Sequence, residues 1–278
     1  MPFIETNHTE KGEKTKLFYQ DYGIGQPIIL IHGWPLSHMT WERQIPALID
    51  AGYRCISYDR RGFGQSSKPW SSYDYSSLAS DLNDLILTLN LNDVVLCGFS
   101  MGGGEVVRYF TDFGSKKISK AILISSIIPL VAKKADNPDG VPEKDLNGIM
   151  ENLQTDYPGF AKEFGKNYFN ASENKDTVSQ GMLDFTWGLA MQASKHATVE
   201  SAKSWAGTDF RPELANVDVP TLIVHGKSDN IVPIKTSADQ AAKGIKNNRY
   251  EKFDDAPHGL YVTHTDKLNK ILIEFLKS

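Results

Sequence analysis

Ser100 stands in a sequence setting that is typical of a catalytic nucleophile. An apolar run, Val94–Cys97, leads into Gly98-Phe99-Ser100-Met101-Gly102, and a helical pattern follows. A Gly-x-Ser-x-Gly string between a strand and a helix predicts a nucleophile elbow, a turn so tight that the residues two before and two after the serine must be small. Such a turn would hold the Ser100 hydroxyl above a sheet, at the positive end of a helix, where it could attack a carbonyl carbon.

A serine nucleophile needs a base and an acid that orients the base, and both follow Ser100 in the chain. Asp229 comes after the buried apolar run Thr221–Val224, and His258 lies in a turn after the last predicted strand. The order serine, acid, histidine is the order that this elbow requires. A carboxylate at this place can fix the imidazole tautomer and stabilise the imidazolium. We therefore assign Ser100, Asp229 and His258 as a catalytic triad.

Four other acidic or imidazole side chains compete for these roles and fit them less well. Asp59 follows a strand but precedes the serine, and Asp218 lies before its strand, at the wrong end. His264 falls at the start of the last helix, where a surface or capping role is expected. His225 ends a strand beside a glycine and is interpreted as a packing residue.

Two backbone N–H groups are predicted to form an oxyanion hole, which binds the negative oxygen of a tetrahedral intermediate. One belongs to Met101, directly after the nucleophile, and the other to Trp34, in the loop after the run Pro27–Ile31. Each such donor contributes on the order of 3 kcal/mol to transition-state stabilisation. Pro35 has no N–H but fixes the backbone next to Trp34. His32 is interpreted as a residue that holds the shape of this loop.

The elements that must position these residues follow an alternating pattern. Two segments around Phe3–Thr6 and Lys16–Tyr22 predict an antiparallel hairpin. Short apolar runs then alternate with amphipathic helical patterns, which is typical of parallel strands covered on both faces and predicts the α/β class. The expected strands are Pro27–Ile31, Tyr53–Tyr58, Val94–Cys97, Lys120–Ser126, Thr221–Val224 and Arg249–Phe253, and the expected helices are Thr40–Asp50, Ser76–Leu89, Met101–Phe113, Ile234–Ala242 and Asp266–Leu276.

One long interval between the expected strands interrupts this alternation. Residues 127–220 contain several helical patterns and no clear strand. A structureless loop of that length is unusual inside a compact domain. We therefore predict a core domain of residues 1–127 and 213–278, with an inserted helical cap of residues 128–212.

Composition excludes several classes of function. The chain has 278 residues and a formal net charge of -4, which does not favour nucleic acid or an anionic membrane surface as a partner. Cys55 and Cys97 fall in apolar runs and are interpreted as buried residues, not disulfide partners. No signal peptide, membrane span or metal-ligand spacing is recognised, so we expect a cytoplasmic protein without a bound metal or other cofactor.

Six motifs appear in order along the whole chain: HGWPLS, YDRRGFGQSSKPW, GFSMGGGEVVRY, TDFRPEL, VPTLIVHGKSDNIVP and DAPHGL. With these motifs the chain resembles the cofactor-free bacterial haloperoxidases, also called non-haem chloroperoxidases, and the similar aryl esterases. The resemblance implies the α/β-hydrolase fold, with a mostly parallel eight-stranded sheet, helices on both faces and a helical cap. It also implies the triad at Ser100, Asp229 and His258, and no cofactor.

The resemblance further implies an acyl-transfer reaction in which either of two small molecules can react with the acyl-enzyme. The predicted function is hydrolysis of short-chain or aryl esters through an acyl-enzyme, with hydrogen peroxide as an alternative to water. The peracid released by peroxide would oxidise halide in solution. We hypothesise that Pro35 favours the peroxide reaction, because it fixes the Trp34 carbonyl where it could accept the second peroxide proton.

The substrate is less clear from the sequence than the triad. Six residues are predicted to line an apolar pocket: Pro35, Phe99, Phe164, Trp187, Trp205 and Ile231. A carbon–carbon bond hydrolase or a lactam hydrolase could use the same triad, and a ligand receptor could keep this fold without turnover. The sequence leaves the oligomeric state open, a homo-oligomer included.

Overall fold

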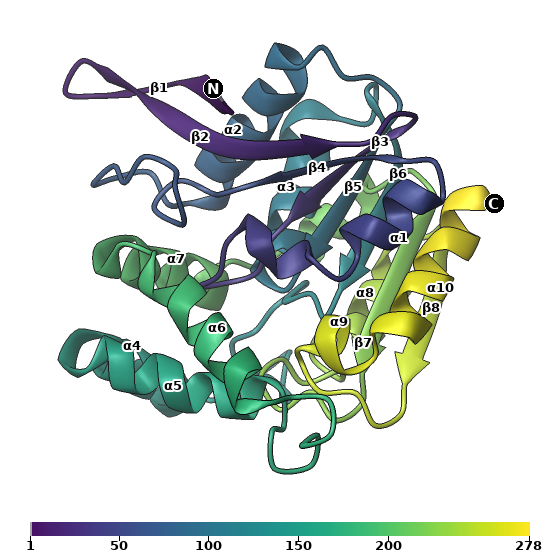
Figure 1. Ribbon diagram of the computed structural model, residues 1–278. Helices are drawn as coiled ribbons and strands as arrows, with labels where there is room; N and C mark the ends of the chain where they lie inside the picture. Colours follow the sequence, from purple (N-terminus) through teal and green to yellow (C-terminus); the bar gives the residue numbers. More distant parts are fainter. Residues whose placement is uncertain (1) are drawn as a thin grey trace.

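Eight strands form a mostly parallel sheet in the computed structural model, which describes residues 2–278 (Figure 1). Their order across the sheet is β1-β2-β4-β3-β5-β6-β7-β8, and only the pairs β1–β2 and β2–β4 are antiparallel within the described residues. The strands are β1 (Phe3–Glu10), β2 (Glu13–Tyr22), β3 (Pro27–Ile31), β4 (Arg54–Tyr58), β5 (Val94–Phe99), β6 (Ile118–Ile124), β7 (Thr221–Gly226) and β8 (Asn248–Phe253). The predicted α/β architecture is confirmed.

Helices follow most of the parallel strands. The helices outside the interval between β6 and β7 are η1 (His38–Trp41), α1 (Ile45–Asp50), α2 (Tyr75–Thr88), α3 (Met101–Phe113), α8 (Ala238–Gly244), α9 (Leu260–Thr263) and α10 (Thr265–Lys277), where η denotes a 3-10 helix. Between β6 and β7 the described chain forms α4 (Glu143–Thr155), α5 (Tyr157–Tyr168), α6 (Gln180–Met191), α7 (Lys195–Gly207) and the 3-10 helix η2 (Arg211–Asn216). Among residues 2–278, none of these helices combines the length and the apolar character needed to cross a membrane.

The sheet has an apolar layer on each face, which explains the apolar runs in its central strands. All five residues of β3 are buried. Ile29 packs in the layer that contains residues of α2, α3 and α8, whereas Ile28 packs in the layer of α1 and α10. Because alternate residues of a strand point to opposite faces, a strand covered on both faces must be apolar throughout.

Two predicted helices differ from the sequence pattern: one is divided and one begins later. The expected helix Thr40–Asp50 divides into η1 and α1, and Pro46 lies in the first turn of α1. Proline lacks the N–H for a helical hydrogen bond and disfavours helical geometry in the residue before it. The helix expected from Ile234 begins at Ala238, because the Thr236 hydroxyl donates to the Leu130 carbonyl and the segment before α8 folds as turns.

The helices α4–α7 lie together at one end of the sheet (Figure 1). They contact the loop after β3: the ring of Trp34 lies edge-on to that of Phe164 in α5, with centroids 5.5 Å apart, and to that of Trp205 in α7, at 5.7 Å. The Trp34 indole N–H also donates to the Thr198 carbonyl of α7. Residues from the expected cap thus cover the edge of the sheet where the parallel strands end.

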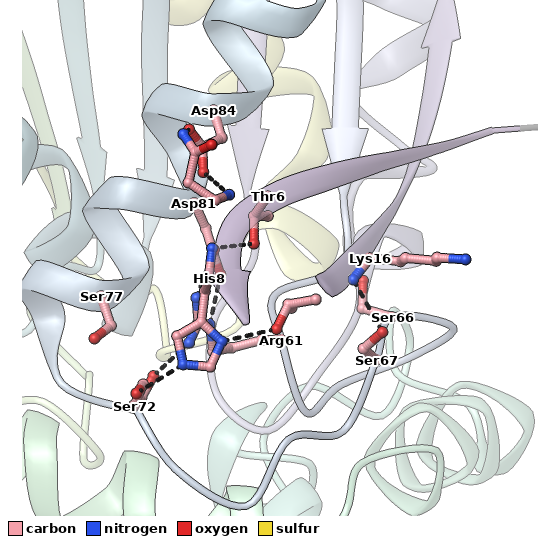
Figure 2. Close-up of polar contacts among 12 residues, drawn as sticks. Thr6, His8, Lys16, Arg61, Ser66, Ser67, Ser72, Ser77, Asp81 and Asp84 are labelled. Atoms are coloured by element: carbon pink, nitrogen blue, oxygen red, sulfur yellow. Dashed lines mark hydrogen bonds and ion pairs between the residues drawn. The ribbon is translucent and has the colours of Figure 1, made fainter. Parts of the chain in front are cut away.

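Polar contacts attach the amino-terminal hairpin to α2 and to the loop after β4 (Figure 2). His8 in β1 lies with its Nε2 3.0 Å from the Ser72 hydroxyl, and the Lys16 N–H donates to the Ser67 side chain. Nearby, Arg61 donates twice to Asp81 of α2, with both distances 2.6 Å. These contacts fix the segment after β4, which also carries Arg60 toward the site described next.

Candidate active site

Ser100 lies at the turn between β5 and α3, in a strained backbone conformation. Its φ is 53° and its ψ is -117°, a region that residues with a side chain rarely adopt. A Cβ on Gly98 would lie 2.5 Å from the Gly102 carbonyl oxygen, and one on Gly102 would lie 2.6 Å from the Ile31 carbonyl oxygen. The turn therefore requires glycine on both sides of the serine, as the sequence string predicted.

Ser100, His258 and Asp229 form a hydrogen-bonded series. The Nε2 of His258 lies 2.9 Å from the Ser100 hydroxyl oxygen, and its Nδ1 lies 2.7 Å from Oδ2 of Asp229. The three residues follow β5, β7 and β8, whose carboxyl ends share one edge of the sheet. With a proton on Nδ1 donated to the carboxylate, Nε2 is free to accept the proton of the serine hydroxyl.

Asp229 is held as a buried carboxylate. Its Oδ1 accepts hydrogen bonds from the backbone N–H groups of Ile231, at 2.9 Å, and Val232, at 2.7 Å. Burial alone would raise the pKa of Asp229, but the nearby His258 and His225 outweigh it and hold this pKa well below its usual value. The carboxylate is therefore ionised throughout the neutral pH range.

The loop after β3 places Trp34 beside the nucleophile. Gly33 is so close to the elbow that a Cβ there would lie 3.1 Å from the Ser100 Cβ. Within residues 2–278, the backbone N–H groups of Trp34 and Met101 donate to no backbone carbonyl. Both N–H groups are thus available to a ligand oxygen, as an oxyanion hole requires.

A cavity of about 480 Å³ opens in front of Ser100. Its wall is largely apolar, and acidic and amide side chains lie among the lining residues. The lining residues are Trp34, Ser100, Met101, Ile127, Val131, Val141, Asp145, Leu146, Ile149, Asn152, Phe160, Glu163, Phe164, Asn167, Trp205, Asn230, Ile231 and Val232. A cavity of this size and character suits a small organic substrate with an apolar body.

Comparison with known proteins identifies the family. The chain matches the alpha/beta hydrolase fold family over residues 26–179 and 192–265. It belongs to this family. A non-haem chloroperoxidase of Kitasatospora aureofaciens is 39% identical over 94% of this chain and 96% of its own length. A bifunctional esterase/perhydrolase of Acinetobacter calcoaceticus is 31% identical over 94% of this chain and 96% of its own.

A solved structure has the same architecture over almost its whole length. The bromoperoxidase of Bacillus anthracis is 39% identical and superposes with a TM-score of 0.95, covering 99% of each chain. The resemblance inferred from the motifs is thus confirmed. The protein is an enzyme of the α/β-hydrolase family, related to the non-haem haloperoxidases.

Three of the predicted pocket residues line the cavity of this hydrolase, and three lie elsewhere. Phe164, Trp205 and Ile231 belong to the cavity wall. Phe99 instead packs in the apolar layer of α10, because it is the last residue of β5 and points away from the Ser100 side. Its ring lies 6.4 Å from that of Trp41 and 5.1 Å from that of Tyr261.

Pro35 and Trp187 are the other two corrections to the predicted pocket. Pro35 borders a separate crevice beside Leu36 and Tyr168, since the chain turns away from Ser100 after Trp34. Trp187 joins α6 to α5: its indole N–H donates to the Pro158 carbonyl at 3.0 Å, and Lys162 lies over its ring. The position of Trp187 on α6 therefore serves the packing of α6 on α5, not the lining of the substrate cavity.

The competitors for the triad roles have other partners in the hydrolase. Asp59 accepts hydrogen bonds from the backbone N–H and the Nδ1 of His38, both at 2.7 Å. Asp218 is exposed and accepts a hydrogen bond from Ser115. His264 lies at the start of α10, with its Nε2 3.1 Å from Asp255.

Sequence reasoning missed the contact between His225 and Asp229. His225 is fully buried, with its Nε2 2.9 Å from the Val232 carbonyl oxygen and 3.1 Å from Oδ2 of Asp229. The signal available in the sequence is the string His-Gly-Lys-Ser-Asp, in which the strand-end histidine and the acid are four residues apart. The loop after β7 folds back so that Asp229 lies beside His225 at the end of the strand, and His225 is therefore more than a packing residue.

A buried ionic cluster under the loop of Trp34 was also missed. The guanidinium of Arg60 pairs with Glu105 of α3, and the Tyr58 hydroxyl donates to the same carboxylate at 2.6 Å. Arg60 also donates from Nη2 to the His32 carbonyl at 2.8 Å, and from its backbone N–H to His32 Nε2 at 3.0 Å. The His32 Nδ1–H donates to the Gly33 carbonyl at 2.8 Å, so His32 holds the loop, as the sequence predicted.

Metal-ligand clusters were not expected from the sequence. Among residues 2–278, no group of three or more His, Cys, Asp or Glu side chains is arranged to hold a metal ion.

Proposed function

We propose that the protein hydrolyses carboxylic esters through an acyl-enzyme on Ser100, and that hydrogen peroxide can replace water in the second step. The observation that carries this proposal is the hydrogen-bonded series from Ser100 through His258 to Asp229, at 2.9 and 2.7 Å, at the base of an apolar cavity. A hydroxyl with a base beside it and an oriented acid behind the base is the arrangement needed for nucleophilic catalysis.

In the first step, the Ser100 oxygen attacks the ester carbonyl while His258 Nε2 takes the hydroxyl proton. The negative charge that forms on the carbonyl oxygen is stabilised by the N–H groups of Trp34 and Met101. His258 then gives its proton to the departing alcohol oxygen as the carbon–oxygen bond breaks, leaving the acyl group on the serine. Asp229 stabilises the positive imidazole during this exchange.

In the second step, a small nucleophile attacks the acyl-serine with the same base. Water gives the carboxylic acid and free serine, and hydrogen peroxide gives the peracid and free serine, with His258 returning a proton to Ser100 in each case. The peracid can then oxidise a halide ion in solution and become the carboxylic acid. Esterase and haloperoxidase activities would therefore share one covalent intermediate.

The cavity supports small esters with an apolar acyl or aryl group as substrates. Its wall near the serine is formed by residues such as Ile127, Phe164, Trp205 and Ile231, and its volume is about 480 Å³. Burial of apolar groups against such a wall would supply most of the binding energy. The relatives named as chloroperoxidase, bromoperoxidase and esterase/perhydrolase support the same pair of reactions.

The experiment compares wild-type protein with Ser100→Ala on p-nitrophenyl acetate, and on bromide with hydrogen peroxide and a halogen-sensitive dye. The control is Ser201→Ala, which removes another buried serine hydroxyl, one on α7. We expect multiple turnovers by the wild type and the control, and loss of both activities in Ser100→Ala. An alanine variant that keeps its ester hydrolysis contradicts the role of Ser100. A wild type that binds ester without turnover contradicts the proposed activity.

A further inference from the structure

His225 has a place in the site that the triad alone does not explain. It lies near the carboxyl end of β7, and its ring is completely buried beside the loop that carries Asp229. Its Nε2 is 2.9 Å from the Val232 carbonyl oxygen and 3.1 Å from Oδ2 of Asp229. The same nitrogen therefore contacts the acid and the peptide that turns back around the acid.

The surroundings of His225 define where its proton is. A carbonyl oxygen can only accept a hydrogen bond, so the contact with Val232 places a proton on Nε2. The other ring nitrogen, Nδ1, is buried and has no hydrogen-bond partner within residues 2–278. A second proton there would be a buried charge without an acceptor, which is energetically costly. The ring is therefore neutral, with its N–H directed at Val232 and close to Asp229.

We propose that His225 is a positioning residue for the acid of the triad, a role that rests on the function proposed above. Its N–H fixes the loop at Val232, whose own N–H donates to Oδ1 of Asp229 at 2.7 Å. It also faces Oδ2, the oxygen that accepts the hydrogen bond from His258. Through these contacts His225 orients the carboxylate of Asp229 toward His258 and makes the electrostatic potential at His258 less negative.

The electrostatic part of this role has a definite sign. The His225 N–H stabilises the ionised Asp229 most when His258 is neutral, because the pair then carries a net negative charge. It stabilises the pair less after His258 has gained a proton and the net charge is zero. His225 therefore lowers the pH at which the Asp229–His258 pair takes up a proton, and its loss should raise that pH.

Tyr168 of α5 is an ionisable group that lies close enough to Asp229 to be affected by its charge. Burial, Tyr261 and the charge of Asp229 hold the pKa of Tyr168 well above its usual value, so its hydroxyl stays protonated. Tyr168 consequently adds no titration of its own between pH 5 and 9. Asp145 and Glu163 of the cavity wall are the same in every variant, so a difference between the variants in the acid limb reports the Asp229–His258 pair.

The test compares two substitutions of matched length, His225→Met and His225→Gln. Both fill the space of the ring, but only glutamine can place an N–H near the position of Nε2. For His225→Met, we expect the acid limb of the kcat/KM profile with p-nitrophenyl acetate to move to higher pH by roughly half a unit to one unit. His225→Gln should return this limb toward the wild-type position. His196→Met, on the surface of α7, is the control for losing a histidine.

A proton NMR measurement provides a readout that does not depend on turnover. The His258 Nδ1–H that donates to Asp229 gives a resonance far downfield, and its exchange and shift with pH report the protonation of the pair. We expect the midpoint of this titration to rise in His225→Met and to be restored in His225→Gln. Thermal unfolding of each variant shows whether it is folded before either measurement.

The outcomes separate this inference from the proposed function. If the wild type turns over ester through Ser100 but His225→Met titrates like the wild type by both readouts, the role of His225 is refuted and the proposed function stands. If activity falls in both His225 variants with no change in either titration, His225 serves only to pack the strand end, which also refutes the role. If Ser100→Ala hydrolyses ester as fast as the wild type, the proposed function is refuted, independently of the result for His225.

Discussion

Neutralising Glu105 should destabilise the protein strongly, because it leaves Arg60 charged and buried without its partner. The side chains of Arg60 and Glu105 are 1% and 0% exposed, and the Tyr58 hydroxyl donates to the same carboxylate. Removing one member of a buried ion pair typically costs about 3–5 kcal/mol. For Glu105→Gln we therefore expect the free energy of unfolding to fall by about this amount, since glutamine keeps the shape but not the charge.

The same substitution should lower activity, because Arg60 also holds the loop that carries the oxyanion donor. Its Nη2 donates to the His32 carbonyl, two residues before Trp34. A complete oxyanion donor is typically worth about 10²–10³ in kcat, so a partial displacement of the Trp34 N–H should reduce kcat by about 10-fold. Urea unfolding gives the stability, and initial rates of ester hydrolysis give kcat.

A double variant, Arg60→Met with Glu105→Leu, distinguishes the effect of an unpaired buried charge on stability from the effect of losing the contacts of Glu105. Replacing both members of a buried pair by apolar residues of similar volume is often close to neutral, so the double variant should regain part of the stability that Glu105→Gln loses, reduced by about 1–3 kcal/mol because the Tyr58 hydroxyl loses its acceptor. It should not regain kcat, because methionine cannot donate to the His32 carbonyl. A double variant that is less stable than Glu105→Gln refutes the argument from buried charge, and one with wild-type kcat refutes the role of Arg60 in the loop.

Three further predictions concern the triad, the loop after β3 and acid stability. Asp229→Asn should lower kcat for p-nitrophenyl acetate by about 10⁴, because an asparagine no longer fixes the His258 tautomer; equal rates would exclude Asp229 as the acid. Pro35→Leu should lower the ratio of perhydrolysis to hydrolysis, measured by dye bromination and ester assays in parallel, and an unchanged ratio would refute the hypothesis for Pro35. Burial and the charge of Arg60 lower the pKa of His32 to about 3. Between that pH and about 6.5, the pKa of an unfolded histidine, only the unfolded chain binds a proton at His32. In this range the free energy of unfolding therefore falls by about 1.4 kcal/mol for each unit that the pH is lowered. His32→Gln should therefore lose less stability than the wild type between pH 7 and 5 in urea titrations, and an identical pH dependence would show that His32 is not buried in the neutral form.

The residues of the triad could be predicted from sequence because strand ends impose their position. β5, β7 and β8 are parallel, so the segments that follow them emerge at one edge of the sheet. Each of the three residues stands in such a segment with a side chain suited to its role, and the chain order favours Asp229 over Asp59 as the acid. The structure places His258 within hydrogen-bonding distance of both Ser100 and Asp229. Their catalytic roles remain predictions until the variants are tested.

The pocket was less predictable, because it depends on side-chain direction. Phe99 and Ser100 are neighbours in sequence, yet the ring of Phe99 packs on the α10 side of the sheet while Ser100 faces the cavity. Between β6 and β7, Trp187 and Trp205 are both half-buried aromatic residues on helices, and only Trp205 lines the cavity of Ser100. Which side of such a helix faces the cavity depends on how the helices pack on one another, and the periodicity of one helix does not contain that information.

Two His-Gly pairs, at the ends of β3 and β7, support the loops that carry the proposed catalytic groups; the sequence predicted this role for His32 but not for His225. His32 and His225 are both fully buried, and each donates from one ring nitrogen to a backbone carbonyl of the loop that carries a proposed catalytic group. The following glycines leave no room for a side chain: a Cβ on Gly33 would lie 2.6 Å from the Phe99 ring, and one on Gly226 would lie 2.0 Å from the Ala256 carbonyl oxygen. A buried imidazole at such a strand end can hold a loop where it must approach its neighbours closely. One loop presents the Trp34 N–H and the other presents the Asp229 carboxylate, so the proposed chemistry depends on two histidines that would not themselves transfer a proton.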